Sequence, residues 1–390
     1  MALSALEEEL RRSGIVLRSS DALRRIATAP GELGFARAYV VGDLDIEGDV
    51  YDALALLERP RTLARLGREL LPALRALGID ALRPLPAPPE EARLRGRRHS
   101  RARDAAAIAH HYDVSNRFYR LVLGPSMTYS CALFADPAAT LEKAQEAKHE
   151  LVARKLGLGE GMRLLDVGCG WGSMLLHAAA RHGVSGVGVT ISRRQAERAR
   201  ERVREAGLAD RIEIRLADYR DVADRPYDAI SSIGMFEHVG LSRLALYFAR
   251  LHALLRPGGR LLNHGIGRPP RRKPILPRRT FVNRYVFPDG ELHEVGAVAS
   301  RMQAAGLEVR HLESLREHYA LTLRRWVRNL EDSWDEAVAE VGSRRARIWR
   351  LYMAGCALAF EAGRLQVHQV LAVRPDRGRS GMPLQAGAWR

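Results

Sequence analysis

Long apolar runs are absent from this 390-residue sequence, and cysteine is scarce. No stretch approaches the roughly 20 apolar residues that a membrane-spanning helix requires, and the first residues, MALSALEEELRRSGIVL, lack the apolar segment of a signal peptide. The three cysteines, Cys131, Cys169 and Cys356, show no CxxC spacing, which argues against a disulfide framework and against a zinc site. We therefore expect a cytoplasmic protein without a bound metal, which would meet a membrane only at its surface.

Acidic residues are in deficit as well. The 46 Asp and Glu residues face 62 Lys and Arg residues, which gives a formal net charge of +16. An excess of this size indicates a polyanionic partner, either nucleic acid or an anionic membrane surface. Charge alone does not choose between the two.

The length and the local patterns indicate two domains. Residues 1–83 mix short helical and strand patterns and predict a small α+β domain. Residues 84–103 combine a proline cluster with a basic run and predict a linker, either solvated or in contact with a membrane. Residues 104–390 form the larger domain, and strands and helices alternate between residues 162 and 222, as in a parallel α/β sheet. The predicted fold class is therefore α/β, Rossmann-like, with a smaller N-terminal α+β domain.

A glycine-rich turn follows the first strand of this alternation, in LLDVGCGWG (164–172). Gly168, Gly170 and Gly172 would let the backbone approach a ligand closely. Asp166 ends the strand, where it could face the ligand through the turn. The pattern D-V-G-C-G-x-G resembles the first motif of methyltransferases that use S-adenosylmethionine (SAM); the alternative is a purely structural turn.

The later strands carry further candidate SAM contacts. The strand that ends in GVGVTISRRQ has no terminal carboxylate for ribose hydroxyls, and Thr190 and Gln195 occupy that region. In LADYRD, Asp218 and Tyr219 stand where such folds hold adenine, and Tyr219 could stack on the base.

An acidic residue closes the next apolar run, in SIGMFEHVG (232–240). Acids are rarely placed at the end of a buried strand without a function, so Glu237 is a candidate for the chemistry.

Seven motifs together resemble those of the cyclopropane-fatty-acyl-phospholipid synthases, in the same order. They are HYDVSNRFYRLVLGPSMTYSCALF (111–134), LLDVGCGWG, GVTISRRQ, LADYRD, GMFEHVG, NRYVFPDGEL and EHYALTLRRW. The resemblance covers about residues 104–375, and the N-terminal segment is similar to that of the longer members, which act on phospholipids. It implies a SAM-dependent methyltransferase fold and activity on a membrane lipid.

In that family, an alkene in a phospholipid attacks the SAM methyl group, and the resulting carbocation loses a proton and closes to a cyclopropane. A bicarbonate ion is thought to take that proton. The resemblance implies a bicarbonate site with Cys131 and Ile266 contributing backbone amides and with side chains from Glu237, His264 and Tyr319. It implies SAM contacts from Tyr129, Ser130, Gly168, Thr190, Gln195 and Tyr219, to which the motifs above add Asp166, Gly170, Gly172 and Asp218.

The chemistry itself explains several of these residue types. Aromatic faces stabilise a cation without attacking it, for about 0.5–2 kcal/mol each, which suits Tyr129, Phe236 and Tyr319. A carboxylate repels an anion unless it accepts the O–H of bicarbonate, and we assign that role to Glu237. His264 would otherwise be interpreted as a satisfied core histidine.

The sequence departs from the family pattern beside His264 and at Tyr219. Members often have Trp in place of Tyr219, and Asn263 and Gly265 replace residues of a His-Thr-Ile-Gly form. The product therefore stays open between a cyclopropane and a methylene- or methyl-branched chain.

The partners implied are an unsaturated phospholipid, an anionic membrane surface at the inner face of the membrane and a second copy of the chain in a homodimer. The basic loop RPPRRKPILPRR (268–279) is either a membrane contact or a solvated loop. Two other functions are weaker alternatives: a SAM-dependent RNA or small-molecule methyltransferase, and a non-catalytic lipid-binding protein. No nucleic-acid-binding module is recognisable, so we expect no nucleic-acid partner.

Overall fold

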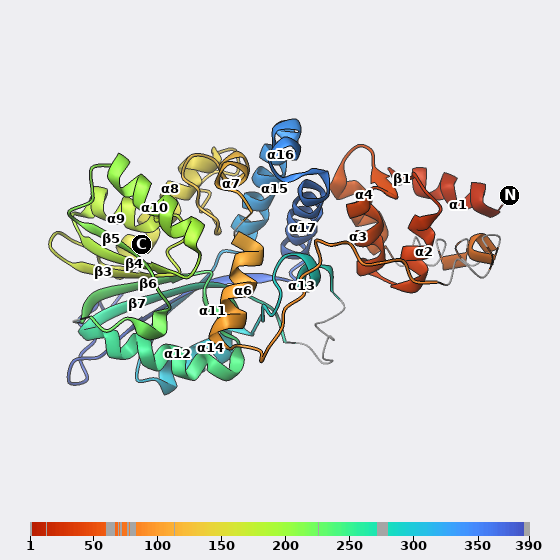
Figure 1. Cartoon of the computed structure of the whole chain (residues 1–390). Helices are drawn as coiled ribbons and strands as arrows, with labels where there is room; N and C mark the ends of the chain where they lie inside the picture. Colours follow the sequence, from red (N-terminus) through yellow and green to blue (C-terminus); the bar gives the residue numbers. More distant parts are fainter. Residues whose placement is uncertain are drawn as a thin grey trace. The chain divides into compact units, whose positions relative to one another are not determined.

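The structure is a computed structural model of the whole chain (Figure 1). It describes residues 2–385 except 13, 60–66, 69, 71, 76–77, 79–82, 113, 225 and 271–279. Within these residues, no helix is both long and apolar enough to cross a membrane. Most of the basic loop at 268–279 lies outside the described residues, so its role as a membrane contact stays a prediction.

The chain divides into two compact units, each assembled from separate stretches of sequence. The first unit comprises Met1–Arg93, Lys273–Pro288 and Leu330–Leu358, and the second comprises Leu94–Arg272, Asp289–Asn329 and Ala359–Arg390. The functional assignment of residues 1–83, 84–103 and 104–390 stays a prediction. Sequence patterns do not reveal that two late segments pack with the N-terminal residues.

The second unit is built on a seven-stranded sheet with the order β5-β4-β3-β6-β7-β9-β8. Its strands are β3 (Arg163–Val167), β4 (Ser185–Thr190), β5 (Ile212–Leu216), β6 (Tyr227–Ile233), β7 (Leu255–Gly267), β8 (Glu308–Ser314) and β9 (Gln366–Val373). Neighbours from β5 to β7 pair in parallel, and β9 runs antiparallel to both β7 and β8. The predicted α/β fold class is confirmed.

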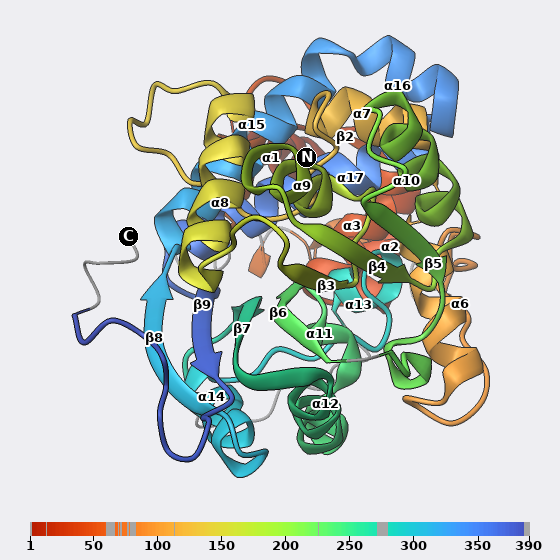
Figure 2. The same cartoon turned by 90° about the vertical axis from the view of Figure 1, so that its left-hand side faces the viewer.

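Helices cover both faces of this sheet and bury one core on each (Figure 2). One face is covered by α8 (Leu141–Leu156), α9 (Ser173–His182) and α10 (Arg193–Glu205), and the other by α11 (Phe236–Val239), α12 (Leu241–Leu254) and α14 (Val295–Ala304). The unit also contains α6 (Arg101–Tyr112), α7 (Asn116–Leu123), the short helix η2 (Tyr219–Asp221) and most of α15 (Arg316–Asp332).

The strand order reverses beside β3, since β4 and β5 follow on one side and β6 and β7 on the other. In open α/β sheets, ligands bind at the carboxyl ends of the strands next to such a reversal. The glycine-rich turn follows β3 at this point, and the segment with Glu237 follows β6. The topology therefore brings both motifs to one edge of the sheet.

The first unit is mainly helical, with a two-stranded antiparallel sheet. Its N-terminal elements are α1 (Ala2–Arg11), β1 (Ile15–Leu17), α2 (Asp21–Thr28), α3 (Glu32–Val41), β2 (Leu44–Ile46) and α4 (Val50–Glu58). They pack with α13 (Phe281–Tyr285), α16 (Trp334–Val341) and most of α17 (Ser343–Glu361).

Charged side chains join these separate stretches of the first unit. Arg347 on α17 bonds the Tyr39 carbonyl at 3.0 Å and the Asp45 carboxylate at 3.1 Å. The buried Glu91 carboxylate accepts from Arg37 at 2.6 Å and from the Tyr285 hydroxyl at 3.1 Å. Because a buried carboxylate is costly without such partners, these contacts specify how the stretches meet.

Candidate active site

The turn after β3 has the conformation that only glycine adopts readily. Gly168, Gly170 and Gly172 have φ values of 76°, 54° and 81°, in the left-handed region that strains other residues. A Cβ atom on Gly170 would find no atom closer than Gln195 Nε2 at 4.0 Å. The turn therefore leaves room for a ligand against its backbone, and Gln195 stands at the side of that space.

Thr190 orients the Gln195 amide. Thr190 ends β4, and its hydroxyl donates to Gln195 Oε1 at 2.8 Å, while Ser192 caps α10 by accepting from the Gln195 backbone at 3.2 Å. Because the hydroxyl engages the amide oxygen, the Gln195 NH2 group faces Gly170. The two residues that replace the missing carboxylate thus act as one pair.

Asp166 lies within the sheet and does not project from the turn. It is buried and accepts a hydrogen bond from Ser231 of β6 at 2.7 Å. Burial raises its pKa to about 6, against the opposing effects of the Ser231 hydrogen bond and of Lys148. The structure therefore shows Asp166 joining β3 to β6, and its contact with SAM stays a prediction.

Lys148, a fully buried residue of α8, was not predicted from the sequence. Its ammonium donates to Ser130 Oγ at 3.0 Å, and burial lowers its pKa to about 8. Its charge helps burial to lower the pKa of His264, and at Asp166 and Cys131 it partly offsets the rise in pKa that burial causes. One cation from α8 is therefore close to three predicted site residues.

Asp218 and Tyr219 form η2 and its cap after β5. Asp218 accepts from the Arg220 backbone at 2.9 Å and from its guanidinium at 2.8 Å. The buried Tyr219 ring packs edge-on against Tyr247 with a centroid distance of 4.8 Å. Both residues lie at the carboxyl edge of the sheet, and their contacts with adenine stay predictions.

Glu237 is held by the strand beside it. It lies on α11, directly after β6, and its Oε1 accepts the backbone N–H of Ile266 on β7 at 2.7 Å. Burial raises the Glu237 pKa to about 7, and the Ile266 hydrogen bond acts in the opposite direction. Its Oε2 is buried and has no hydrogen-bond partner among the described residues. In this structure the Ile266 amide therefore positions Glu237. The predicted contact of that amide with an anion would require one N–H group to be shared between Glu237 and the anion.

Gly265 permits the close packing that supports Glu237. An ideal Cβ at Gly265 would lie 1.9 Å from Cε1 of Phe236. The Phe236 ring therefore rests directly on the β7 backbone, between His264 and Ile266. Gly265 thus has a steric function beside Glu237.

The protonation of His264 follows from two neighbours. The Lys155 ammonium, which can only donate, bonds Gln369 Oε1 at 2.6 Å. The Gln369 NH2 group therefore faces His264 Nδ1, at 3.2 Å, and donates to it. A neutral His264 must then carry its proton on Nε2, which is buried and has no partner among the described residues. Burial first, and then the charges of Lys148 and Lys155, lower the His264 pKa well below its usual value, so this ring stays a neutral Nε2–H donor.

Cys131 is a poor nucleophile in this setting. Its thiol is fully buried and donates to the carbonyls of Ala132 at 3.2 Å and Leu315 at 3.6 Å. Burial raises its pKa, so the reactive thiolate is disfavoured. The thiol connects this loop to the start of α15, the helix that carries Tyr319.

Two of the three predicted aromatic residues, Tyr129 and Tyr319, belong to a larger aromatic cluster, whereas Phe236 packs on Gly265. Tyr129 stacks on Trp326 of α15 at 5.2 Å between ring centroids, and Trp326 meets Tyr319 edge-on at 6.0 Å. Tyr319 also contacts Phe360 at 4.8 Å, and Tyr129 contacts Tyr112 at 6.0 Å. The structure brings Tyr129 and Tyr319 together, with Trp326 and Tyr112 as members that were not predicted individually.

The predicted site residues all lie in the second unit. The turn glycine Gly168 is next to Met235, since a Cβ atom on it would lie 3.3 Å from Met235 Sδ, two residues before Glu237. Residues that sequence reasoning missed are Lys148, Lys155, Gln369 and Trp326. Trp326 lies in the quoted motif EHYALTLRRW, whereas a lysine in a helix pattern carries no signal that it is buried.

Known proteins are similar to this chain over two thirds of its length or more. Residues 99–370 match the family model described as mycolic acid cyclopropane synthetase. A probable fatty acid methyltransferase of Mycobacterium tuberculosis is 49% identical over 384 residues, which cover 95% of this chain and 90% of that protein. The cyclopropane-fatty-acyl-phospholipid synthase of Escherichia coli K12 is 39% identical over 264 residues, which cover 68% of this chain and 66% of that protein.

A solved structure supports the same relationship. The crystal structure of the mycolic acid cyclopropane synthase CmaA1, complexed with SAH and CTAB, superimposes with a TM-score of 0.64 at 34% identity. The match covers 69% of this chain and 97% of that chain.

Proposed function

Because this chain belongs to the mycolic acid cyclopropane synthetase family, we propose that it transfers the methyl carbon of SAM to the cis double bond of an unsaturated phospholipid acyl chain. The product proposed is a cyclopropane ring. The observation that carries this proposal is a pair of buried polar atoms without partners among the described residues, Glu237 Oε2 and His264 Nε2, at the edge of the sheet where the glycine turn lies.

The residues present fit SAM. The glycine turn leaves open space at Gly170, and the Gln195 amide faces that space from the side. SAM supplies an electrophilic methyl group on a sulfonium. Gly168, Gly170, Thr190 and Gln195 would hold it, and Tyr219 and Asp218 would lie towards its adenine.

An alkene is a weak nucleophile, so the protein must act by placement and by stabilising positive charge. The rings of Tyr129, Trp326 and Tyr319 offer electron-rich faces to a cation that develops on the acyl chain, for about 0.5–2 kcal/mol each. The burial of Trp326 and Tyr319 also keeps out water, which would otherwise trap the cation as an alcohol.

The two unpartnered atoms also fit bicarbonate. His264 Nε2–H is a donor that suits an oxyanion, and an ionised Glu237 Oε2 accepts an O–H. Bicarbonate has both groups, and it would supply a weak base for proton removal. A carbonate or a phosphate trianion lacks the protonated oxygen that Glu237 would select.

A second product fits the same site. A relative at 49% identity is named a probable fatty acid methyltransferase, which favours a methylene-branched chain from the same cation; a separate reductase would convert that chain to a methyl-branched one. The cyclopropane requires loss of a proton from the transferred methyl group, whereas the methylene branch also arises from that carbon after a hydride shift along the chain. Asn263 and Gly265, next to His264, depart from the His-Thr-Ile-Gly form of the family, and these departures bear on the choice between the two products.

The product is tested by NMR of phospholipids from cells that express the protein. We expect upfield cyclopropane ring protons, absent from cells with an empty vector. Methylene or methyl-branch signals would replace the first product by the second. Unchanged lipids, with folded protein that binds SAM, would contradict both.

We also propose that the chain works at the cytoplasmic, inner face of an anionic membrane, as a homodimer and without a nucleic-acid partner. The net charge of +16 supports the membrane contact. The N-terminal residues are proposed to assist lipid binding or assembly.

Gln369 is proposed as a positioning residue, because it fixes the donor on His264. In Gln369→Met, we expect turnover to fall about 10-fold at unchanged SAM affinity, since the Nε2–H tautomer is no longer enforced. Nitrogen-15 NMR of the imidazole should change from one tautomer to a mixture. The control, Glu313→Gln, alters the other partner of Lys155 and should keep the tautomer. A single Nε2–H tautomer in Gln369→Met would contradict this role.

A further inference from the structure

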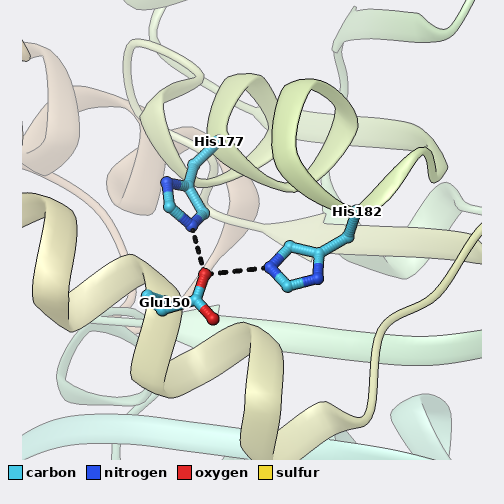
Figure 3. A group of neighbouring side chains, drawn as sticks. All are labelled: Glu150, His177 and His182. Carbon is cyan, nitrogen blue, oxygen red and sulfur yellow. Dashed lines mark hydrogen bonds and ion pairs between the residues drawn. The ribbon is translucent and has the colours of Figure 1, made fainter.

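A second group of chemistry-bearing side chains lies outside the candidate active site. Glu150 comes from α8, and His177 and His182 come from α9 (Figure 3). Their ligand atoms lie within 4.8 Å of one another. Glu150 Oε2 is 3.1 Å from His177 Nε2 and 3.0 Å from His182 Nε2, and Figure 3 shows both imidazoles pointing at this one oxygen.

We propose that Glu150, His177 and His182 form a binding site for a first-row divalent metal ion, with zinc as the best match. Two imidazole nitrogens and one carboxylate oxygen form a common zinc ligand set, completed by water at the fourth position. Ligand atoms on tetrahedral zinc, at about 2.0–2.1 Å from the metal, lie about 3.3 Å apart. The observed separations of 3.1 and 3.0 Å would need to widen by only a few tenths of an ångström.

The backbone explains how two histidines five positions apart reach one point. At 100° per residue they lie about 140° apart around α9, too far for a shared face in the middle of a helix. His182, however, is the last residue of α9, and Gly183 follows in a left-handed conformation with φ of 66°. The helix end therefore lets the second imidazole turn towards Glu150.

The surroundings suit a site of moderate affinity. The side chains of His177, His182 and Glu150 are 9%, 19% and 33% exposed, so water can reach the fourth position. Arg154 lies 3.3 Å from the other carboxylate oxygen, Oε1, and leaves Oε2 for the metal. The neighbouring Glu146 is engaged by Arg181 at 2.7 Å. The positive Arg154 would weaken metal binding without blocking it.

The ion would connect two helices that support the candidate active site. The glycine-rich turn leads into α9, and α8 carries Lys148 and Lys155. A metal bound across them would add a cross-link between α8 and α9 in the folded state and would raise the thermal midpoint in proportion to the logarithm of free metal. This role is independent of the reaction proposed above. The proposed metal site differs from the prediction of no metal, which was based on the spacing of the cysteines.

The test uses full-length protein stripped with a chelator and titrated with zinc against a chromophoric competitor. We expect one zinc per chain, with at least 10-fold weaker binding in His177→Gln/His182→Gln and in Glu150→Gln. His252→Gln, a change in a half-buried histidine of α12, should bind zinc like the wild type. Equal affinity in the wild type and the double variant would overturn the proposal.

Cobalt substitution gives a readout that needs no variant. Wild-type protein with one equivalent of Co²⁺ should show the intense visible d–d bands of a four-coordinate site, and its thermal midpoint should rise with metal concentration. Only the weak bands of hexaaqua cobalt, with an unchanged midpoint, would show that the three side chains form a hydrogen-bonded group and nothing more.

Discussion

The substitution Glu237→Gln should lower turnover about 100- to 1,000-fold and change SAM affinity by less than about 3-fold. The amide oxygen that this substitution introduces can keep the hydrogen bond from the Ile266 N–H, so the backbone geometry is retained. What is lost is the carboxylate oxygen Oε2, the acceptor proposed for the O–H of bicarbonate. Because that contact acts on the proton-removal step, the loss should appear in kcat.

Kinetics on vesicles that contain unsaturated phospholipid, together with calorimetric SAM titrations, would measure both quantities. Glu308→Gln, a change in a partly exposed carboxylate of β8, is the matched control and should behave like the wild type. Added bicarbonate should restore little activity to Glu237→Gln. A parallel loss of SAM affinity and turnover would show that Glu237 supports the glycine-rich turn instead.

The same substitution should remove a pH-dependent cost to stability. The Glu237 pKa is raised to about 7, because burial disfavours the carboxylate, whereas the unfolded chain loses this proton near the ordinary value of 4.5. The folded state therefore holds more protons between these values, and stability falls as pH rises through that window, then levels off above it. Between pH 5 and pH 8.5 the free energy of unfolding of the wild type should fall by about 2–3 kcal/mol more than that of Glu237→Gln.

Urea titrations at both pH values, followed by tryptophan fluorescence, would test this difference. Asp166, whose pKa is raised to about 6 by burial, titrates in the same window and the same direction. Because it is present in both proteins, its contribution largely cancels when the variant is subtracted from the wild type. An unchanged difference between the two proteins at pH 5 and pH 8.5 would mean that Glu237 ionises in the folded state as readily as in water.

The sequence predicts the parts of the site that depend on local backbone and on order along the chain. The glycine turn, the Thr190–Gln195 pair and the position of Glu237 after β6 each follow from a strand that ends at a known edge of the sheet. The fold class follows from the alternation of strands and helices. These features are encoded within short segments, so they can be recognised without the partners that pack against them.

Other features depend on contacts between distant segments. Gln369 lies 105 positions from His264, and its role depends on β9 pairing with β7. Lys155 is charged and would be expected at the surface, yet it is fully buried beside Gln369. Register and burial of this kind are set by the assembled sheet, so residue type alone could not indicate them.

The boundary between two helices that are close in sequence is also hard to predict from residue type. Residues 101–123 contain two helices, α6 and α7, and Ser115 caps α7 by accepting from the Phe118 backbone at 3.3 Å. The interruption allows His111 and Tyr112, at the end of α6, to join the rings around Tyr129. A hydrophobic pattern locates a helix more reliably than it locates a break within one.

The composition of the first unit has a consequence for biosynthesis. Residues 1–93 leave the ribosome well before their partners around Arg347, which follow some 250 residues later. At about 5–20 residues per second, the early segment waits roughly 13–50 s before Tyr39 and Asp45 can meet Arg347. During that interval, surfaces that end up buried are exposed to chaperones and to other nascent chains. The N-terminal region therefore stays incomplete until late in translation, although it is made early.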